Sequence, residues 1–393
     1  MPNDKIVQTT IIGKVYKENK GKTYRLNCLQ EEYFRLIKLY VSMGLELKDM
    51  SKSSLHEFTY KIICNKFNLQ TGLIQTARDK SIEILQSFKK SDKEKTEKKR
   101  KNRKLKMKRI SIRFDQRSFK FEKKESKLTP YWLILSTIGV KSDRISLPVQ
   151  LGKKQIEKLE NGWRPSSVEM VKKNGQWFAH ITIEKWIKFK EPKTIIGIDI
   201  GEVNFAAAMA IRIDNQEKYM KGQIWRGEEI KRIRGLYGHI RRSLGRKKLP
   251  KKIKEIGQKE NRKVNQEVHI IGNDIIEYAK QFEDPIIAME DLTNIRYSFD
   301  KGKKLNKRFH SLPFYKLRKY IEYKSNKEGI DVRFIEPFDT TKTCHRCGNV
   351  SSVYDREYIC SKCGMVYNRD LNSSINIAHF LMREINSNGM EEK

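Results

Sequence analysis

The chain has 393 residues, and its 83 Lys and Arg against 48 Asp and Glu give a formal net charge of +35 at pH 7. This length is enough for two or three domains, and the excess of basic residues, clustered in runs, favours a polyanionic partner over a merely solvated surface. No stretch approaches 18 consecutive apolar residues and the start lacks the apolar segment of a signal peptide, so we expect a cytoplasmic protein with no membrane partner.

The first half of the chain is predicted to be a β-rich domain interrupted by a block of helices. Residues 6–29 contain Thr, Val and Tyr and are expected to be extended. Apolar residues then recur at helical spacing over residues 30–90, where residues 54–57 form a candidate capping box for the second of three helices. Over residues 110–187 apolar and polar residues alternate, which predicts strands.

Two basic runs interrupt this pattern. Residues 89–109 contain 13 basic and three acidic residues, so they are either a disordered linker or an arm that binds nucleic acid. Residues 231–252 contain ten Lys or Arg, together with Tyr237 and His239, and no acid. Basic groups could follow phosphates there while aromatic rings stack on bases, and a solvated helix face is the alternative.

The second half has a regular order of predicted elements. A nearly continuous apolar strand at residues 194–200 is followed by a hairpin, by a basic helical region over residues 228–282 and by a second buried strand at residues 285–291. A helix that ends at Gly329, a further strand and a last helix that begins near Asp370 complete the order. This order is that of an RNase H-like fold.

Three acids occupy the ends of these elements. Asp199 lies in the first strand, Glu290 lies at the carboxyl end of the second, and Asp370 lies at the start of the last helix. Such positions can converge at one edge of a sheet, where carboxylates would hold Mg²⁺, and two ions about 3.5–4 Å apart would serve phosphodiester hydrolysis. As alternatives, Asp370 is a plain helix cap or N-terminal charge, and Glu290 is a surface acid paired with Arg296.

Four of the six cysteines form two pairs with the spacing of a zinc ribbon, namely Cys344, Cys347, Cys360 and Cys363. Gly348 and Gly364 directly follow the two pairs and permit tight turns. Four thiolates complete the coordination of zinc, so the ion is expected to be structural. His345 is interpreted as an exposed loop residue rather than a ligand, and Cys28 and Cys64 as inert core thiols.

The segments "GIDIG", "AMEDL" and "TTKTCHRCG…YICSKCGMVYNRDLNSSINIA" resemble the TnpB family of transposon-encoded proteins, whose RuvC-like nuclease is shared with compact type V CRISPR effectors. The resemblance covers roughly the second half of the chain closely. It implies an α/β multidomain protein in which an RNase H-like (RuvC-type) nuclease domain carries an inserted zinc ribbon and follows a β-barrel-like wedge domain with a helical recognition insertion. The implied domains are 1–29 with 110–190 (wedge), 30–109 (recognition), 191–340 with 366–393 (nuclease) and 341–365 (zinc ribbon).

The resemblance further implies an RNA-guided, Mg²⁺-dependent DNA endonuclease of a prokaryotic, nucleoid-associated kind. It would bind a guide RNA and cut target double-stranded DNA beside a short flanking motif, while base pairing in the RNA–DNA heteroduplex reads the sequence. Asp199, Glu290 and Asp370 carry over as catalytic metal ligands, and the four cysteines as zinc ligands. A monomer is favoured over a dimer.

Some residues depart from the family pattern. Glu202 and Val203 follow the "GIDIG" stretch, and Asn368, Ser373 and Ser374 replace the usual residues of the last motif. None of these departures removes a carboxylate, so a functional nuclease is expected. The alternatives are a compact type V CRISPR effector, a guide-directed DNA-binding regulator with weak or no cleavage, and an unguided nuclease such as a Holliday-junction resolvase.

Overall fold

The chain divides into two compact units, Ile6–Lys185 and Met1–Lys5 with Trp186–Lys393. The computed structural model describes residues 4–16, 19–46, 51–93, 105, 107, 110–139, 143–214, 219–291, 312–336, 339–351 and 356–391. Most of the basic run at residues 89–109 therefore lies outside the described residues. None of the described helices is both long and apolar enough to cross a membrane.

The unit formed by Ile6–Lys185 is built on a seven-stranded sheet, as the alternating pattern predicts. Its order is β2-β6-β7-β1-β5-β4-β3. The strands are β1 (Lys5–Val15), β2 (Ile112–Asp115), β3 (Phe119–Lys123), β4 (Tyr131–Ser136), β5 (Arg144–Gln150), β6 (Arg164–Lys173) and β7 (Gln176–Ile187). In β7 every second side chain from Trp177 to Ile183 is buried, because successive side chains of a strand point to opposite faces.

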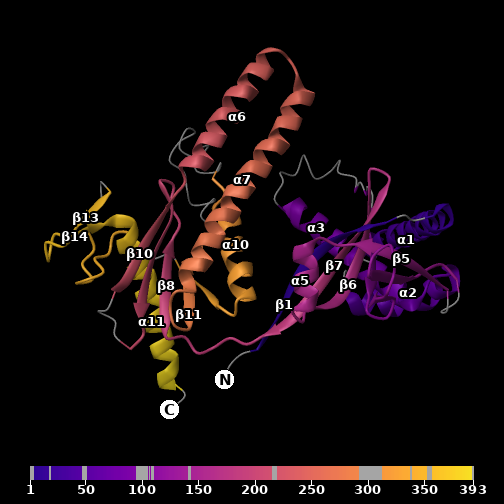
Figure 1. Cartoon of the computed structure of the whole chain (residues 1–393), viewed down its shortest axis with the longest axis horizontal. Coiled ribbons are helices and arrows are strands. Elements are labelled where there is room, and N and C mark those ends of the chain that lie inside the picture. The colour runs from indigo at the N-terminus through magenta and orange to yellow at the C-terminus, as the bar shows by residue number, and fades with distance from the viewer. Residues whose placement is uncertain are drawn as a thin grey trace. The chain divides into compact units, whose positions relative to one another are not determined.

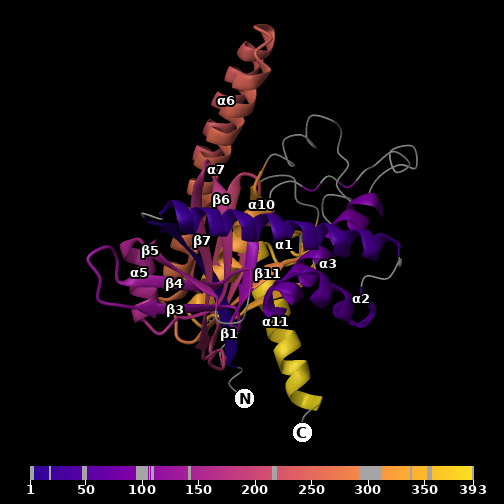
Figure 2. The ribbon, with the colours of Figure 1, turned by 90° about the vertical axis from the view of Figure 1, so that its right-hand side faces the viewer.

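Helices cover this sheet and share one apolar core with it. They are α1 (Lys20–Glu46), α2 (Lys52–Lys66), α3 (Thr71–Lys93) and the short α5 (Lys153–Glu160). Figure 2 shows α1 crossing the strands. The predicted block of three helices between the first strand and the rest of the sheet is therefore confirmed, although its start differs from the prediction.

Two local predictions in this block are wrong. Residues 6–29 are not extended throughout, because α1 already begins at Lys20, where the Asn19 side chain accepts the backbone N–H of Lys22 at 2.8 Å. The helical apolar spacing also starts earlier than expected, with Leu26 and Leu29 fully buried. Residues 54–57 are not a capping box, since Ser51 caps α2 by accepting the backbone N–H of Ser54 at 3.2 Å.

The other unit contains a five-stranded sheet in the order β10-β9-β8-β11-β12. Its strands are β8 (Thr194–Asp199), β9 (Asn204–Arg212), β10 (Tyr219–Arg226), β11 (Pro285–Glu290) and β12 (Val332–Ile335). The pairs β10–β9 and β9–β8 are antiparallel, and β8–β11 and β11–β12 are parallel. The predicted order of strand, hairpin, helices, strand, helix, strand and helix is confirmed.

Helices lie on both faces of this sheet because β8 is apolar on both sides. Ile196 and Ile198 belong to a core shared with α6 (Glu228–Arg246), α7 (Pro250–Ala279) and α10 (Phe314–Lys327). Ile195 faces the opposite core, which includes α11 (Arg369–Glu391). The short strands β13 (Glu357–Ile359) and β14 (Val366–Asn368) form a separate hairpin before α11. In both views the α6–α7 hairpin extends well beyond the five-stranded sheet (Figure 1).

Candidate active site and cysteine cluster

Two of the three predicted acids end neighbouring parallel strands. The last paired residues of β8 and β11 are Ile198 and Met289, and Asp199 and Glu290 follow them directly. Because the strands run in the same direction, both carboxyl groups lie at one edge of the sheet. The local cause is that each acid directly follows a run of buried apolar residues that fixes its strand in the centre of the sheet.

Asp370, the third acid, is the second residue of α11. Its carboxylate accepts a hydrogen bond from Asn204 Nδ2 at 2.6 Å, and Asn204 begins β9 at the same edge of the sheet. The cap of α11 is instead Asn368, whose Oδ1 accepts the backbone N–H groups of Asp370 and Leu371 at 3.1 Å each. The alternative in which Asp370 merely caps the helix is therefore wrong.

Electrostatics indicate that the three acids lie close together. Burial, then the charges of Glu290 and Asp370, raise the pKa of Asp199 to about 8, against a smaller opposing effect of Arg369. Burial also raises the pKa of Glu290, and a hydrogen bond of 2.5 Å from the Thr340 hydroxyl opposes that rise. Three carboxyl groups at one sheet edge, two of which raise the pKa of the third, are a donor set that suits a hard divalent cation.

The carboxylate oxygens of the three acids are not all within 4.8 Å of one another, whereas the sulfur atoms of the four cysteines are. Among the residues that the structure describes, the cysteines are the group of metal-ligating side chains found with ligand atoms all within 4.8 Å of one another. The proposed partner of Glu290, Arg296, lies outside the described residues.

Sequence reasoning missed the polar groups that hold these acids. Asn204 binds Asp370 and Thr340 binds Glu290, while Arg356 Nη1 lies 3.4 Å from Asp370 Oδ2. One of them could have been found, because a hairpin between β8 and β9 must return Asn204 to the edge at which Asp199 lies. No sequence signal distinguishes Thr340 from its neighbour Thr341, since only folding decides which hydroxyl meets the carboxylate.

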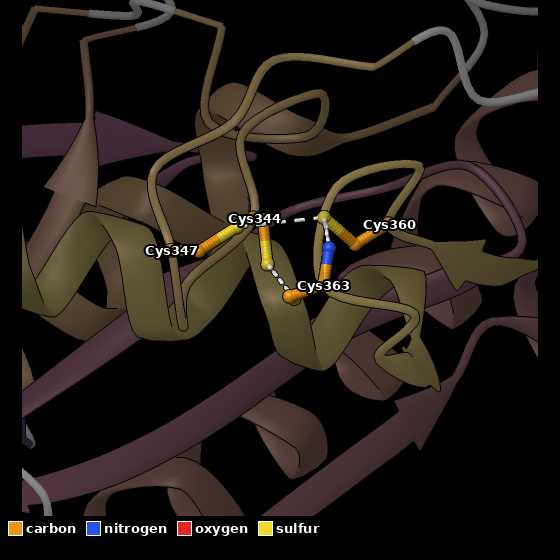
Figure 3. Close-up of side chains that lie close together, drawn as sticks. All are labelled: Cys344, Cys347, Cys360 and Cys363. Atoms are coloured by element: carbon orange, nitrogen blue, oxygen red, sulfur yellow. Dashed lines mark hydrogen bonds between the residues drawn. The ribbon is translucent and has the colours of Figure 1, made fainter.

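The four predicted zinc ligands form a compact cluster (Figure 3). Cys344 Sγ lies 3.8 Å from Cys363 Sγ, and Cys347 Sγ lies 3.5 Å from Cys360 Sγ. Tetrahedral zinc with bonds of about 2.3 Å would require sulfur–sulfur distances of about 3.8 Å. The backbone N–H of Cys363 is the main cause that lowers the pKa of the Cys360 thiol to about 6, whereas burial raises the pKa of the Cys344 thiol to about 12. The cluster therefore fits a tetrahedral thiolate-bound ion.

The two halves of the cluster have the same backbone geometry. Gly348 donates its N–H to the Cys344 carbonyl at 2.9 Å, and Gly364 donates to the Cys360 carbonyl at 3.0 Å. Both glycines have left-handed φ angles, 71° and 66°. A side chain is disfavoured at such angles, so the glycines predicted to permit tight turns do so.

His345 differs from the expectation of an exposed loop residue. Its backbone N–H and its Nδ1 both lie within hydrogen-bonding distance of Asn372 Oδ1 in α11, at 3.1 and 2.9 Å. The ring packs edge-on against Tyr219 and Tyr367 and is half-buried. Asn372 also donates to the Thr343 carbonyl at 2.8 Å. His345 thus joins the cysteine cluster to the helix that carries Asp370.

The second basic run forms the exposed part of the α6–α7 hairpin, but one of its predicted stacking groups is wrong. Tyr237 is buried in the core, whereas His239 is exposed. Glu260 of α7 is also buried and forms ion pairs with Arg234, at 2.9 Å, and with Arg241. Two of the ten basic residues therefore hold the hairpin together, and a third, Arg232, is paired with Glu229 at 2.6 Å.

Comparisons with known proteins agree with this architecture. Residues 314–377 match the family model described as Cas12f1-like, TNB domain. A solved complex of Cas12f1 with single-guide RNA and target DNA superimposes with a TM-score of 0.64 at 16% identity, over 91% of this chain and 82% of that one. At that identity the likeness shows the fold: the chain has the mixed α/β architecture of a compact Cas12 effector.

Curated relatives match the sequence itself. An endodeoxyribonuclease Cas12f1 of Sulfoacidibacillus thermotolerans is 30% identical over 220 residues, 52% of this chain and 50% of that protein. A TnpB-like protein of Aquifex aeolicus is 25% identical over 255 residues, 58% of this chain and 82% of that protein. A TnpB-like protein of Methanocaldococcus jannaschii is 30% identical over 233 residues, 57% of this chain and 81% of that protein. With this identity over four-fifths of a relative, the chain belongs to the TnpB-like family.

Proposed function

We propose that this protein is an RNA-guided DNA endonuclease that cuts both strands of its target at one RuvC-type site, formed by Asp199, Glu290 and Asp370. The observation that carries the proposal is the position of the acids: Asp199 and Glu290 end neighbouring parallel strands, and Asp370 is hydrogen-bonded to Asn204 at the same edge of the sheet. Acids are brought together in this way where a cation is to be bound. Relatives named as endodeoxyribonucleases and a structural neighbour in complex with guide RNA and target DNA support the choice of substrate.

The residues of this chain would divide the work as follows. Asp199 and Glu290, on the rigid ends of β8 and β11, and Asp370 on α11 would hold two Mg²⁺ ions. Bound Mg²⁺ supplies a water activated for attack on the scissile phosphorus and neutralises charge on the leaving 3′ oxygen. Thr340 and Asn204 orient the carboxyl groups of Glu290 and Asp370 through hydrogen bonds of 2.5 and 2.6 Å.

The cysteine cluster would hold one structural Zn²⁺. Four thiolates fill a tetrahedral coordination sphere and leave no open position for a substrate. The ion would hold the two cysteine pairs in the arrangement in which His345 contacts Asn372 of α11. We further propose wedge, recognition, nuclease and zinc-ribbon domains, with the start of the recognition domain moved from residue 30 to Lys20, where α1 begins, and a transposon as the genetic setting.

The test is cleavage by the full chain purified with its own RNA. The RNA is sequenced, a plasmid is built with a matching target beside a randomised flanking sequence, and cleavage is measured with Mg²⁺. We expect the wild-type protein to cut the matched plasmid. We expect Asp199→Ala to lose this cleavage while it still binds RNA and target. Cutting without the guide would favour an unguided resolvase, and guided binding without any cutting would favour a regulator.

A compact CRISPR effector is the second candidate, because relatives named Cas12f1 match 66% and 52% of this chain. The chemistry would be identical. The two candidates differ in the genome, where transposon ends or a repeat array would flank the gene. They also differ in the copurified RNA, which would contain a repeat-derived segment only in the CRISPR case.

A further inference from the structure

Aromatic and basic side chains alternate along the exposed side of α10. One row, at every fourth residue, consists of Tyr315, Lys319, Tyr323 and Lys327. The neighbouring row, half-buried beside α7, consists of Lys316, Tyr320 and Lys324. Tyr315 and Tyr323 are 57% and 36% exposed, while the opposite face of the helix is buried. Positions four apart share one face of a helix, so rings and ammonium groups lie side by side.

Two of the three rings, those of Tyr320 and Tyr323, are held in place by each other and by α7. Tyr320 stacks on His269 of α7 with ring centroids 3.9 Å apart and an angle of 16° between the planes. Tyr323 meets Tyr320 edge-on at 5.8 Å, and Lys327 Nζ lies 4.7 Å from the Tyr323 centroid. A ring that is already oriented loses little conformational entropy when a flat ligand stacks on it.

Two of the lysines are oriented by neutral groups. Lys316 Nζ donates to Asn265 Oδ1 at 2.7 Å, and Lys324 Nζ donates to Asn273 Oδ1 and, at 3.2 Å, to the His269 carbonyl. These partners fix the ammonium groups by neutral atoms, although the charge of Asp274 also acts on Lys324. By contrast, Lys319 is paired with Glu322 at 2.8 Å. The face therefore offers positive charge at set positions rather than a network of closed ion pairs.

This face begins at the edge of the sheet that carries the acids. Since α10 connects the parallel strands β11 and β12, its first residues lie near the end of β11, where Glu290 stands. Arg318 fixes this end by an ion pair of 2.5 Å with Asp291, the residue after Glu290. From Tyr315 to Tyr323 the face then continues for about 12 Å along the helix axis.

We propose that this face of α10 binds single-stranded DNA that leads to the nuclease site, an inference that rests on the proposed function. Unpaired bases would stack on Tyr315 and Tyr323 while Lys316 and Lys324 contact the phosphates. Bases inside a duplex have no free faces, so exposed flat rings beside ammonium groups fit an unpaired strand. A duplex contacted only through its phosphates would need the lysines and not the rings.

The experiment is photo-crosslinking of the full-length chain. The probe is a thymidine 20-mer that carries 5-bromodeoxyuridine, and the Asp199→Ala variant is used so that the probe stays intact. After irradiation the crosslinked peptides are mapped by mass spectrometry. Crosslinks at Tyr315 or Tyr323 are expected, and crosslinks confined to other elements would overturn the proposal. Unlabelled single-stranded DNA must compete better than duplex DNA or a uridine 20-mer RNA; equal competition overturns the assignment to single-stranded DNA.

Variants separate stacking from mere folding. Tyr315→Ala with Tyr323→Ala should raise the half-saturating probe concentration at least about fivefold, because one stacked base contributes that much. Tyr315→Phe with Tyr323→Phe keeps the rings and should bind within about twofold of the parent. Tyr24, 68% exposed on α1, provides the matched control, and Tyr24→Ala should bind as the parent does. Equal losses in the Ala and Phe variants would overturn stacking.

The endonuclease assignment and the binding face on α10 can each fail without the other. If guided cleavage is absent but the crosslinks at Tyr315 or Tyr323 are present, the binding face stands and the endonuclease assignment falls. If guided cleavage occurs and no crosslink maps to α10, the binding face is wrong and the endonuclease assignment stands.

Discussion

Gly197 of β8 and Ser374 of α11 are in direct backbone contact. A Cβ atom at Gly197 would overlap the carbonyl oxygen of Ser374 and lie 2.8 Å from the backbone nitrogen of Ala378. Asp199 follows Gly197 by two residues, and Asp370 precedes Ser374 by one helical turn. The approach of helix to strand at this point therefore sets how near the two acids lie, and only glycine permits it.

Gly197→Ala should displace α11 from the sheet. Backbone atoms cannot move aside as a side chain can, so we expect a loss of stability of about 1–3 kcal/mol or more and a strong loss of guided cleavage. Thermal unfolding and plasmid cleavage measure the two effects. The control is Gly235→Ala on α6, where a Cβ meets nothing within 4 Å and helix propensity improves. Equal behaviour of the two variants would show that the contact is unimportant.

Thr340→Val should weaken the hold on Glu290 while keeping the size of the side chain. Losing a group that orients a metal-binding carboxylate costs about 10–100-fold in metal affinity or activity. We expect cleavage to require more Mg²⁺ for half-maximal rate, and Thr340→Ser to restore the wild-type requirement. A change in melting temperature without any shift in the Mg²⁺ dependence would contradict this role.

Asp199→Asn should abolish cleavage and yet stabilise the metal-free protein. At about pH 9, where Asp199 is largely ionised, the substitution removes one of three neighbouring negative charges. We expect a melting temperature about 2–4 °C above that of the wild type for each kcal/mol of repulsion relieved. Saturating Mg²⁺ should shrink the difference, because only the wild type gains full cation binding. A difference that Mg²⁺ leaves unchanged would contradict the assignment.

Glu169 should make the unit formed by Ile6–Lys185 sensitive to acid. Burial opposes its charged form, but the hydrogen bond from Ser111 and the charges of Lys80 and Arg113 outweigh that effect and lower its pKa to about 2. A depressed pKa contributes stability that is complete above the unfolded value of about 4.3 and is lost as the pH falls toward the folded value.

Urea unfolding between about pH 6 and pH 3 tests this linkage. The difference in unfolding free energy between the wild type and Glu169→Gln should shrink steadily as the pH falls. Glu157→Gln, at an exposed position on α5, serves as the control and should follow the wild type. A difference that stays constant over this range would mean that the ionisation of Glu169 does not contribute.

Cys360→Ser should release the structural metal. Purified wild-type protein is expected to contain about one zinc per chain by elemental analysis, and the variant much less, because one ligand of four is lost. The loss should also loosen the contact of His345 with Asn372 and lower the melting temperature. Cys64→Ser, outside the cluster, should keep its zinc. Zinc retained in Cys360→Ser would contradict the site.

Much of the fold could be predicted from local pattern. The strands β8 and β11 are visible in the sequence as continuous apolar runs, and β7 is visible as an alternation of apolar and polar residues. Each residue in these segments is apolar or polar according to whether its side chain is buried. The start of α1 could not be predicted, because Thr, Val and Tyr near residue 20 favour strands. The helix forms there because Leu26 and Leu29 pack against a sheet whose strands are distant in sequence. The cap of α2 was misplaced by three residues for a similar reason, since several serines compete for that role.

The sequence by itself determined which residue types are present and at what spacing, and that was enough to name the four cysteines and the three acids. Ligand spacing in a zinc ribbon is local, and strand ends converge wherever a sheet is parallel. Only the tertiary structure decided which neutral groups hold those acids, that His345 binds Asn372, and that Gly197 admits the backbone of Ser374. These contacts join residues far apart in the chain. Their energies change when the distance between the atoms changes by a few tenths of an ångström, and no local sequence pattern encodes such differences.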